Sequence, residues 1–303
     1  MDKQIAVIGA GTMGNGIAHV FALSGYTVFL FDSNAAQLQK ALGTISKNLD
    51  RQVTRGLLDE NQRTASLAKI TLADSLEAAV KNAFLVIEAA TEKEAIKLEI
   101  FREIDRFASS KAILASNTSS ISITKIAAVT SRPDQVIGMH FMNPVPVMKL
   151  VEIINGFKTS NTVTDETVSI ARSLGKEPYV AADFPGFVSN RILMPMINEA
   201  ILCLQESVGS VESIDAIMRL GMSHPMGPLQ LADFIGLDVC LNILRVLQEG
   251  FGNPKYAPAT LLVNMVEAGD LGVKTGQGFY VYEAGRKELV VSQRFLMHLF
   301  KSI

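Results

Sequence analysis

The sequence predicts an α/β protein, with a Rossmann-type doubly wound sheet followed by an all-α C-terminal domain. Three observations support this fold class. Short apolar strands alternate with helical patterns through the first half, a glycine-rich turn follows the first strand, and nearly every apolar pattern after Asp183 has helical spacing. Pro185-Gly186 interrupts the chain where the pattern changes, and a length of 303 residues suits two domains. We therefore predict domains at 1–183 and 184–303.

The first strand leads directly into the glycine-rich turn. A strand is expected at Gln4–Ile8 and a helix at Met13–Leu23, and the letters at 9–14 read G-A-G-T-M-G. In this setting Gly9 is expected to make the turn, Gly11 to let a pyrophosphate approach the backbone, and Gly14 to let helix and strand pack closely. The free N–H groups and the positive end of the helix dipole favour phosphate at this point.

The second strand ends at an acidic residue. Gly25 ends the first helix, Thr27–Phe31 is the expected strand, and Asp32 follows it. A carboxylate at this distance from the glycine motif accepts a hydrogen bond from an adenosine 2′-hydroxyl and repels a 2′-phosphate. The sequence thus predicts NAD in preference to NADP, and the alternative is a merely glycine-rich turn.

The elements that follow continue the alternation of helix and strand. Helices are expected at 35–57, 59–68, 93–108, 123–129 and 162–174, and strands at 70–72, 84–88, 112–115, 136–141, 150–154 and 177–182. Arg51 and Arg55 lie one turn apart on the first of these helices, where they form either a solvated face or a basic stripe for an anionic substrate tail. Five small polar residues, S-N-T-S-S, follow a strand at the edge where ligands bind in such sheets.

Two apolar strands carry one histidine and one glutamate. His140 stands near the end of Val136–Phe141 and Glu152 in the middle of Leu150–Ile154, with a proline-rich turn between them. A buried carboxylate is costly without a partner, and the imidazole across the turn is the nearest candidate. A bond between them fixes the imidazole tautomer and leaves the other nitrogen as a base. The alternative is a core histidine beside a glutamate that lies exposed on an edge strand.

The second half is predicted to be helical. Helices are expected at 187–207, 211–220, 229–235, 237–249 and 259–268. Asn190 either points toward a cleft or is simply a polar residue at a helix start. Lys274 lies in a glycine-punctuated loop that either folds around a ligand or forms a surface turn before a short closing strand. In the tail from Glu283, Ser292–Phe300 is amphipathic and packs as an extra helix or frays. The abundance of Leu, Ile and Met predicts a homodimer through this domain.

Composition argues against several classes of function. A net charge of −2 and a pI of about 6.1 give no electrostatic footprint for nucleic acid or a membrane surface. Cys203 and Cys240 lie in helical apolar patterns and are expected to be reduced, as in a cytoplasmic protein. No histidine has a second ligand at metal spacing, so no metal is expected. An apolar strand begins by Ile5, so we expect neither a signal peptide nor, from the remaining apolar runs, a membrane span.

Several ordered motifs together resemble the short-chain L-3-hydroxyacyl-CoA dehydrogenases over about residues 3–282. The motifs are G-A-G-T-M-G at 9–14, S-N-T-S-S at 116–120, H-F-M-N-P-V-P at 140–146, K-L-V-E at 149–152, P-G-F-V-S-N-R at 185–191, H-P-M-G-P at 224–228 and K-T-G-Q-G-F-Y at 274–280. The resemblance implies NAD as the cofactor, an acyl-CoA of short chain as the substrate, and hydride transfer at C3.

The resemblance also implies roles for individual residues. His140 is the expected acid–base group, Glu152 orients it, and Ser119 and Asn190 hold the substrate oxygen and the histidine. The implied NAD contacts are Gly9, Gly11, Thr12, Met13, Gly14, Asp32, Glu92, Lys97, Ser119, Asn143 and Lys274. The implied substrate contacts are Asn48, Arg51, Arg55, Ser119 and Asn143. Asn48 and Arg55 stand where relatives often carry serine and lysine, and the arginine keeps the charge with a different contact geometry.

Two other functions stay open at this point. One is an NAD-dependent dehydrogenase of a free hydroxy acid such as gulonate, which a comparison of acetoacetyl-CoA with free acetoacetate would separate. The other is a non-catalytic NAD-binding protein on the same scaffold, which requires a broken histidine–glutamate pair because fold alone does not fix function.

Overall fold

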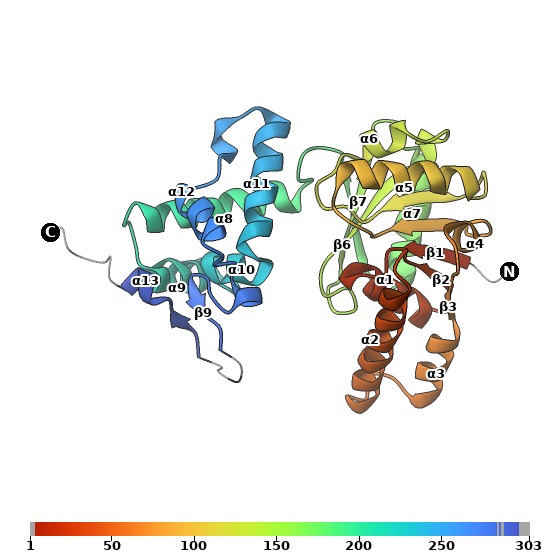
Figure 1. The fold of residues 1–303 in the computed structure, drawn as a ribbon, viewed down its shortest axis with the longest axis horizontal. Helices are drawn as coiled ribbons and strands as arrows, with labels where there is room; N and C mark the ends of the chain where they lie inside the picture. Colours follow the sequence, from red (N-terminus) through yellow and green to blue (C-terminus); the bar gives the residue numbers. More distant parts are fainter. Residues whose placement is uncertain (1–3, 284, 286–287, 297–303) are drawn as a thin grey trace. The chain divides into compact units, whose positions relative to one another are not determined.

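A computed structural model describes residues 4–283, 285 and 288–296. The chain forms two compact units that divide between Phe187 and Val188, a few residues beyond the predicted domain boundary. We call them the first unit and the second unit. The predicted fold class is confirmed, because a doubly wound sheet occupies the first unit and helices dominate the second (Figure 1).

Eight strands form the sheet of the first unit. They are β1 (Gln4–Ile8), β2 (Thr27–Phe31), β3 (Ile70–Leu72), β4 (Leu85–Glu88), β5 (Ile113–Ser116), β6 (Val136–Phe141), β7 (Leu150–Asn155) and β8 (Glu177–Ala182). The strand order is β3-β2-β1-β4-β5-β6-β7-β8, and only the β6–β7 pair is antiparallel. The order reverses between β1 and β4, and ligands bind in open α/β sheets at the carboxyl ends of the strands beside such a reversal.

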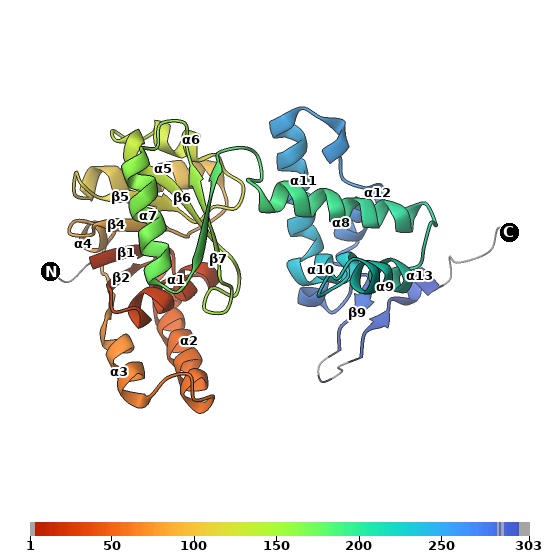
Figure 2. The same cartoon turned by 180° about the vertical axis from the view of Figure 1, so that it is seen from behind.

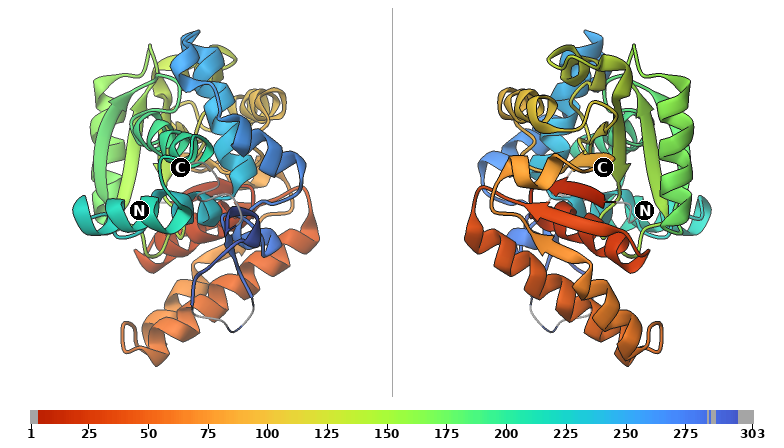
Figure 3. Two further views of the ribbon diagram at one scale, coloured as in Figure 1. Left: turned by 90° about the vertical axis from the view of Figure 1, so that its left-hand side faces the viewer. Right: turned by 90° about the vertical axis from the view of Figure 1, so that its right-hand side faces the viewer.

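Helices cover both faces of this sheet. One face carries α1 (Thr12–Leu23), α2 (Ala35–Thr54), α3 (Glu60–Ala68) and α7 (Asn161–Ser173), and the other carries α4 (Leu76–Val80), α5 (Glu94–Phe107) and α6 (Ile123–Ala128) (Figure 2). Successive strand residues point to opposite faces, so Ile5 and Val7 pack on the side of α1 while Ala6 and Ile8 pack on the side of α4 and α5. Figure 3 shows α2 and α3 as a helix pair that extends beyond the sheet.

Two short elements of the first unit were not predicted. They are α4 and a single 3₁₀ turn, η1 (Pro133–Gln135). Ser75 caps α4 by accepting a hydrogen bond from Ala78 N. A helix of one turn contains too few apolar repeats to produce a periodic pattern, which explains why sequence analysis passed over it.

The second unit contains five main helices around one apolar core. They are α8 (Ser189–Gln205), α9 (Val211–Gly221), α10 (Pro228–Ile235), α11 (Leu237–Phe251) and α12 (Thr260–Glu267). Beside these helices, β9 (Tyr280–Val281) and β10 (Val290–Val291) pair as a small antiparallel sheet. Shorter pieces complete the unit, namely η2 (Pro254–Tyr256), η3 (Val273–Thr275) and α13 (Gln293–Leu296). The expected C-terminal helix at Ser292–Phe300 is described only as α13, and its remainder lies outside the described residues.

Two buried aspartates hold the second unit together. Asp215 accepts from Leu229 N at 2.8 Å and from Gln230 N at 3.0 Å, at the start of α10. Asp233 accepts from Phe279 N at 3.1 Å and Tyr280 N at 2.9 Å. These bonds fix the start of β9 and the loop before it, which carries Lys274. Burial raises the pKa of Asp233 to about 6 against these hydrogen bonds.

Candidate active site

The glycine turn between β1 and α1 has the geometry of a dinucleotide-binding turn. Gly9 has a φ of +100°, and a Cβ there would lie 2.6 Å from the carbonyl oxygen of Ala89. A Cβ at Gly14 would lie 1.7 Å from the carbonyl oxygen of Gly9, so only glycine allows the helix to pack this closely. A Cβ at Gly11 would meet nothing within 4 Å. The backbone at Gly11 is thus open to a ligand at the N-terminus of a helix, where phosphate is favoured.

Asp32 is fixed at the end of β2 against this turn. Its carboxylate accepts from Ala10 N at 2.8 Å and from Asn34 N at 2.9 Å. Gln37, on the first turns of α2, donates from Nε2 to the carbonyl of Ala10 at 2.9 Å. The acidic residue therefore lies at the carboxyl end of its strand, where a ribose contact is expected, and that contact itself stays a prediction.

His140 and Glu152 form the hydrogen bond that sequence analysis expected. The two residues are directly opposite in the β6–β7 register, and His140 Nδ1 lies 2.8 Å from Glu152 Oε2. Glu152 is only 4% exposed, so the alternative of a glutamate exposed on an edge is wrong. An ionised carboxylate only accepts, so the bond places the proton on Nδ1 and leaves proton exchange with a ligand to Nε2. The ring of Phe187 lies 6.0 Å from the imidazole ring, centroid to centroid.

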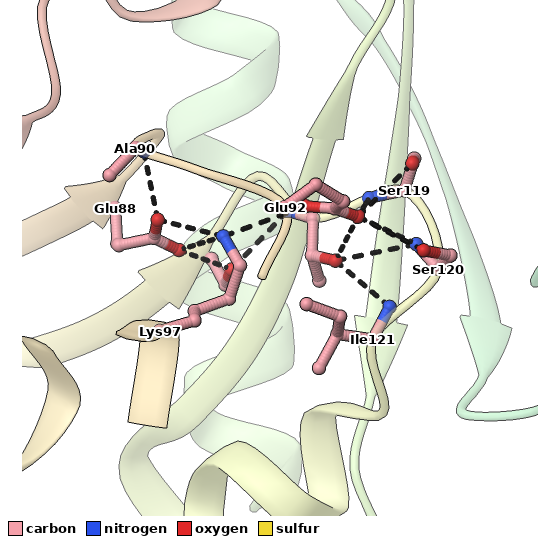
Figure 4. Close-up of polar contacts among 9 residues, drawn as sticks. Glu88, Ala90, Glu92, Lys97, Ser119, Ser120 and Ile121 are labelled. Carbon is pink, nitrogen blue, oxygen red and sulfur yellow. Dashed lines mark hydrogen bonds and ion pairs between the residues drawn. The ribbon is translucent and has the colours of Figure 1, made fainter. Parts of the chain in front are cut away.

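The small polar residues after β5 surround Glu92, which lies in the loop after the neighbouring strand β4 (Figure 4). Glu92 Oε1 accepts from Thr118 Oγ1 at 2.6 Å, from Ser119 N at 2.9 Å and from Ser120 N at 3.2 Å. Burial alone would raise the pKa of Glu92, but the charge of Lys97 and these hydrogen bonds outweigh it, so the pKa is lowered. The loop that carries Ser119 is thus held by an ionised carboxylate.

Lys97 is buried next to this loop. It is 1% exposed, and its Nζ lies 2.7 Å and 2.6 Å from the two carboxylate oxygens of Glu88, which is itself 0% exposed. Glu92 Oε2 lies 3.7 Å from the same ammonium (Figure 4). Lys97 is therefore not an exposed cation that reaches toward a cofactor. It supports Glu92, and a direct contact with NAD stays a prediction.

Sequence analysis missed Glu88, the last residue of β4. Its carboxylate accepts from Ala90 N at 2.8 Å and from Ser116 Oγ at 2.7 Å, besides the ammonium of Lys97. The residue thereby joins the ends of β4 and β5 to α5. A charged residue that ends an apolar strand was the available signal, because such a carboxylate needs partners when it is buried.

Several predicted substrate and cofactor residues meet at one pocket of about 250 Å³ in the first unit. Its lining comes from α1, α2 and the chain at 143–146, and includes Thr12, Asn48 and Asn143. Arg51 lies on the same helix as Asn48, with Nη1 3.4 Å from Asn48 Oδ1, and Arg55 caps the end of that helix. The two arginines are exposed and do not line the pocket itself.

The remaining predicted residues belong to the second unit. Asn190 is buried on the first turn of α8. Lys274 lies in η3 and forms an ion pair with Asp238 of α11. Their roles toward the histidine and the cofactor stay predictions.

The described residues also bear on other kinds of site. In the part of the chain that the structure describes, no helix is both long and apolar enough to cross a bilayer. Within that same part, no cluster of three or more histidine, cysteine or acidic residues is placed to bind a metal ion. Cys203 and Cys240 are both free thiols.

The doubly wound sheet and its glycine turn define a dinucleotide-binding protein of the Rossmann class, with a histidine–glutamate pair beside the binding edge. The chain belongs to the 3-hydroxyacyl-CoA dehydrogenase family: the family's NAD binding domain matches residues 4–184, and its C-terminal domain matches residues 186–282. It is therefore an NAD-dependent oxidoreductase of that family.

Individual relatives are similar over nearly their whole length. The 3-hydroxybutyryl-CoA dehydrogenase of Bradyrhizobium diazoefficiens is 52% identical, over 94% of this chain and 97% of the relative. The mitochondrial hydroxyacyl-coenzyme A dehydrogenase of Homo sapiens is 40% identical, over 93% of this chain and 91% of its own. Among solved structures, (S)-3-hydroxybutyryl-CoA dehydrogenase from Ralstonia eutropha has a TM-score of 0.91 at 49% identity, with 93% and 100% of the two chains covered.

Proposed function

We propose that the protein interconverts (S)-3-hydroxyacyl-CoA and 3-ketoacyl-CoA of short chain, with 3-hydroxybutyryl-CoA and acetoacetyl-CoA as its substrate pair. The single observation that carries the proposal is the buried hydrogen bond between His140 Nδ1 and Glu152 Oε2, at 2.8 Å. The relatives at about half identity are named as dehydrogenases of 3-hydroxybutyryl-CoA, which supports the same substrate class.

The residues around the glycine turn fit NAD. The open backbone at Gly11, the helix N-terminus and the fixed carboxylate of Asp32 suit a pyrophosphate and a ribose. When bound, NAD accepts or supplies the hydride at C3 of the substrate.

The chain itself handles the proton and holds the reactants. In oxidation, Nε2 of His140 takes the proton of the 3-hydroxyl group, and in reduction it returns one to the ketone oxygen. Glu152 holds the imidazole in the required tautomer and stabilises its positive charge once it is protonated, as the carboxylate of a hydrolase triad does. The main-chain N–H of Ser119 donates to Glu92, and in this proposal its hydroxyl turns from Glu92 to donate to the substrate oxygen, with Asn190 as a further polar contact.

The acyl-CoA is proposed to occupy the pocket between α1, α2 and the chain at 143–146. Asn48 and Asn143 line it from opposite elements, so one pocket contains a residue of the expected coenzyme A helix and a residue expected near the thioester. The exposed guanidinium groups of Arg51 and Arg55 on α2 and at its end supply positive charge for the phosphates of coenzyme A.

We further propose that the protein acts in the cytoplasm, in fatty acid and butanoate metabolism.

We also propose that it forms a homodimer through the second unit. The support for the dimer is an apolar pocket of about 530 Å³ lined mainly by α8 and α9, next to Ile217, Leu220 and Met222 of α9 and its C-cap, which are 61%, 78% and 61% exposed. A second copy that covers these side chains would remove them from water. Light scattering after gel filtration should give twice the chain mass, and Leu220→Glu should give one chain mass.

One assay separates this proposal from a dehydrogenase of free hydroxy acids. NADH oxidation is followed with acetoacetyl-CoA and with free acetoacetate, and only the coenzyme A ester should be reduced at a substantial rate.

His140→Gln should lower turnover by about 10²–10⁴-fold with NADH affinity retained, because it removes the proton donor and not the dinucleotide site. Near-native turnover of that variant would refute the assigned role, and initial rates with C4, C8 and C12 3-ketoacyl-CoA would define the chain length.

A further inference from the structure

A buried lysine that no role yet explains lies immediately before β8. Lys176 is 8% exposed, and its Nζ donates to the carbonyl oxygen of Val145 at 2.5 Å and to that of Met148 at 2.7 Å. The partners that the structure describes for this ammonium are thus main-chain carbonyls of one segment. A desolvated ammonium is costly, so its presence requires a compensating structural or functional use.

Both carbonyls belong to the segment that joins β6 to β7, which we call the 143–148 turn. The turn closes on itself, because Val147 N and Met148 N both donate to the carbonyl of Pro144 at 3.0 Å. Val145 is 2% exposed and lies against Gly16 of α1, where a Cβ would come within 2.8 Å of Val145 Cβ. The turn is therefore fixed from two sides, by the lysine and by the close approach of a helix glycine.

The same turn forms one wall of the pocket assigned to the substrate. Asn143, Pro144, Val145 and Pro146 all line it, across from α2. The turn also connects the strand of His140 to the strand of Glu152. A shift of the turn would therefore move the pocket wall at the place where the thioester is expected.

The surroundings disfavour a second positive charge beside Lys176, whose own pKa burial lowers. His19 of α1 is 1% exposed, and burial together with the charge of Lys176 lowers its pKa, so the imidazole beside the lysine is neutral. An ammonium has three donors, so it can bind two carbonyls at once, and its charge strengthens each bond.

We propose that Lys176 is a positioning residue for the acyl-CoA substrate: its ammonium holds the 143–148 turn so that Asn143 and the two prolines form a fixed wall of the pocket. The identity of the ligand in this inference rests on the proposed function. The positioning itself does not, because it concerns only the turn.

The test compares Lys176→Met with Lys149→Met. Lys149 is a matched control, since it flanks the same turn but its side chain is 77% exposed and 3.7 Å from Glu177. We expect Lys176→Met to lower kcat/KM for acetoacetyl-CoA by about tenfold to a hundredfold, mainly through KM, as displaced substrate contacts do. The Kd for NADH should change by less than about twofold, and hydrogen exchange should accelerate in residues 142–149 but not across the whole sheet. Lys149→Met should behave as the unsubstituted protein.

Two results would overturn the proposal. One is an unchanged KM together with unchanged exchange in the turn, and the other is a uniform rise in exchange, which would indicate a stabilising role alone. If Lys176→Met does not fold, Gly16→Ala displaces Val145 from the other side without burying an unpaired group, and a normal KM in that variant would contradict the inference. If the unsubstituted protein does not reduce acetoacetyl-CoA, the proposed function fails, while the exchange measurement still decides whether Lys176 fixes the turn.

Discussion

Each unit of the molecule contains two neighbouring carboxylates, and the two pairs have different hydrogen-bond partners. All four are buried except that of Glu92, whose side chain is 42% exposed. In the first unit, Glu88 and Glu92 flank the ammonium of Lys97, and the pKa of Glu92 is lowered. In the second unit, Asp215 and Asp233 take their hydrogen bonds from main-chain N–H groups and tyrosine hydroxyls, and burial raises the pKa of both.

This contrast distinguishes the carboxylates beside the candidate active site from the aspartates that stabilise the fold of the second unit. A carboxylate at the ligand edge of a sheet keeps its charge because a buried cation and a loop of donors compensate its desolvation. The aspartates of the second unit connect α10 to β9 with weaker compensation, and Asp233, with a pKa of about 6, can be protonated in mild acid. Buried acids alone therefore do not mark a functional site, and the kind of compensation distinguishes the two clusters.

The largest effect is expected at Lys97. Lys97→Met leaves the fully buried carboxylate of Glu88 without its cation, and the free energy of unfolding should fall by about 3–5 kcal/mol. The exposed pair of Lys125 with Glu94, at 3.1 Å, is the control. Lys125→Met should cost no more than about 1 kcal/mol in urea titrations followed by circular dichroism. Equal losses in the two variants would remove the claimed distinction between buried and exposed pairs.

A smaller effect with a defined pH dependence is expected at Asp233. Its folded pKa of about 6 lies above the ordinary value of 3.8, so the folded state binds the proton more tightly between these values. As pH falls from 7 to 4, the stability of the unsubstituted protein relative to Asp233→Asn should rise by about 2 kcal/mol. Unfolding titrations at several pH values measure this gap, and a gap that shrinks in acid would reverse the sign we derive.

Glu92 should show the opposite dependence. Its pKa is lowered from the ordinary 4.5, so its stabilising contribution is complete above that value and is lost as pH falls through the folded pKa. The stability gap between the unsubstituted protein and Glu92→Gln should be no more than about 1 kcal/mol, because the Glu92 side chain is 42% exposed and water screens its charge. This gap should stay constant from pH 8 to pH 5. It should close only in stronger acid. A stability gap that already varies near pH 6 would mean that the pKa of Glu92 is raised, as that of Asp233 is.

The smallest effect is expected for the exposed cations of the first unit. Arg55→Ala should raise the KM for acetoacetyl-CoA only a few-fold, because exposed charge pairs contribute about 0–1 kcal/mol. The increase should disappear as the ionic strength is raised, since salt screens exposed charges. The measurement is KM at low and high salt, and a large, salt-independent loss would mean that Arg55 makes a desolvated contact.

Much of the fold could be predicted because its signals are local. The alternation of strands and helices, the glycine turn and the acidic end of β2 depend on neighbours in sequence. The bond between His140 and Glu152 was also predictable, since a hairpin of antiparallel strands brings nearby residues opposite one another.

The parts that sequence analysis missed depend on distant partners. Glu88 bonds Ser116, which lies 28 positions away, and Asp233 bonds Tyr280, which lies 47 positions away. Helical spacing indicated that Lys97 lies on a helix, but not that its ammonium is buried against Glu88. A short closing strand after the Lys274 loop was one expectation, but its pairing with β10 was not predicted, because two-residue strands carry no periodic signal.

The most direct test of the central claim is the turnover of Glu152→Gln with acetoacetyl-CoA and NADH, measured together with NADH affinity. The amide keeps the shape of the side chain but cannot stabilise a protonated His140. We expect a fall in kcat on the order of 10²–10⁴-fold, with a Kd for NADH within about twofold of the unsubstituted protein. A kcat within a few-fold of that protein would contradict the claim that this buried pair performs the proton transfer.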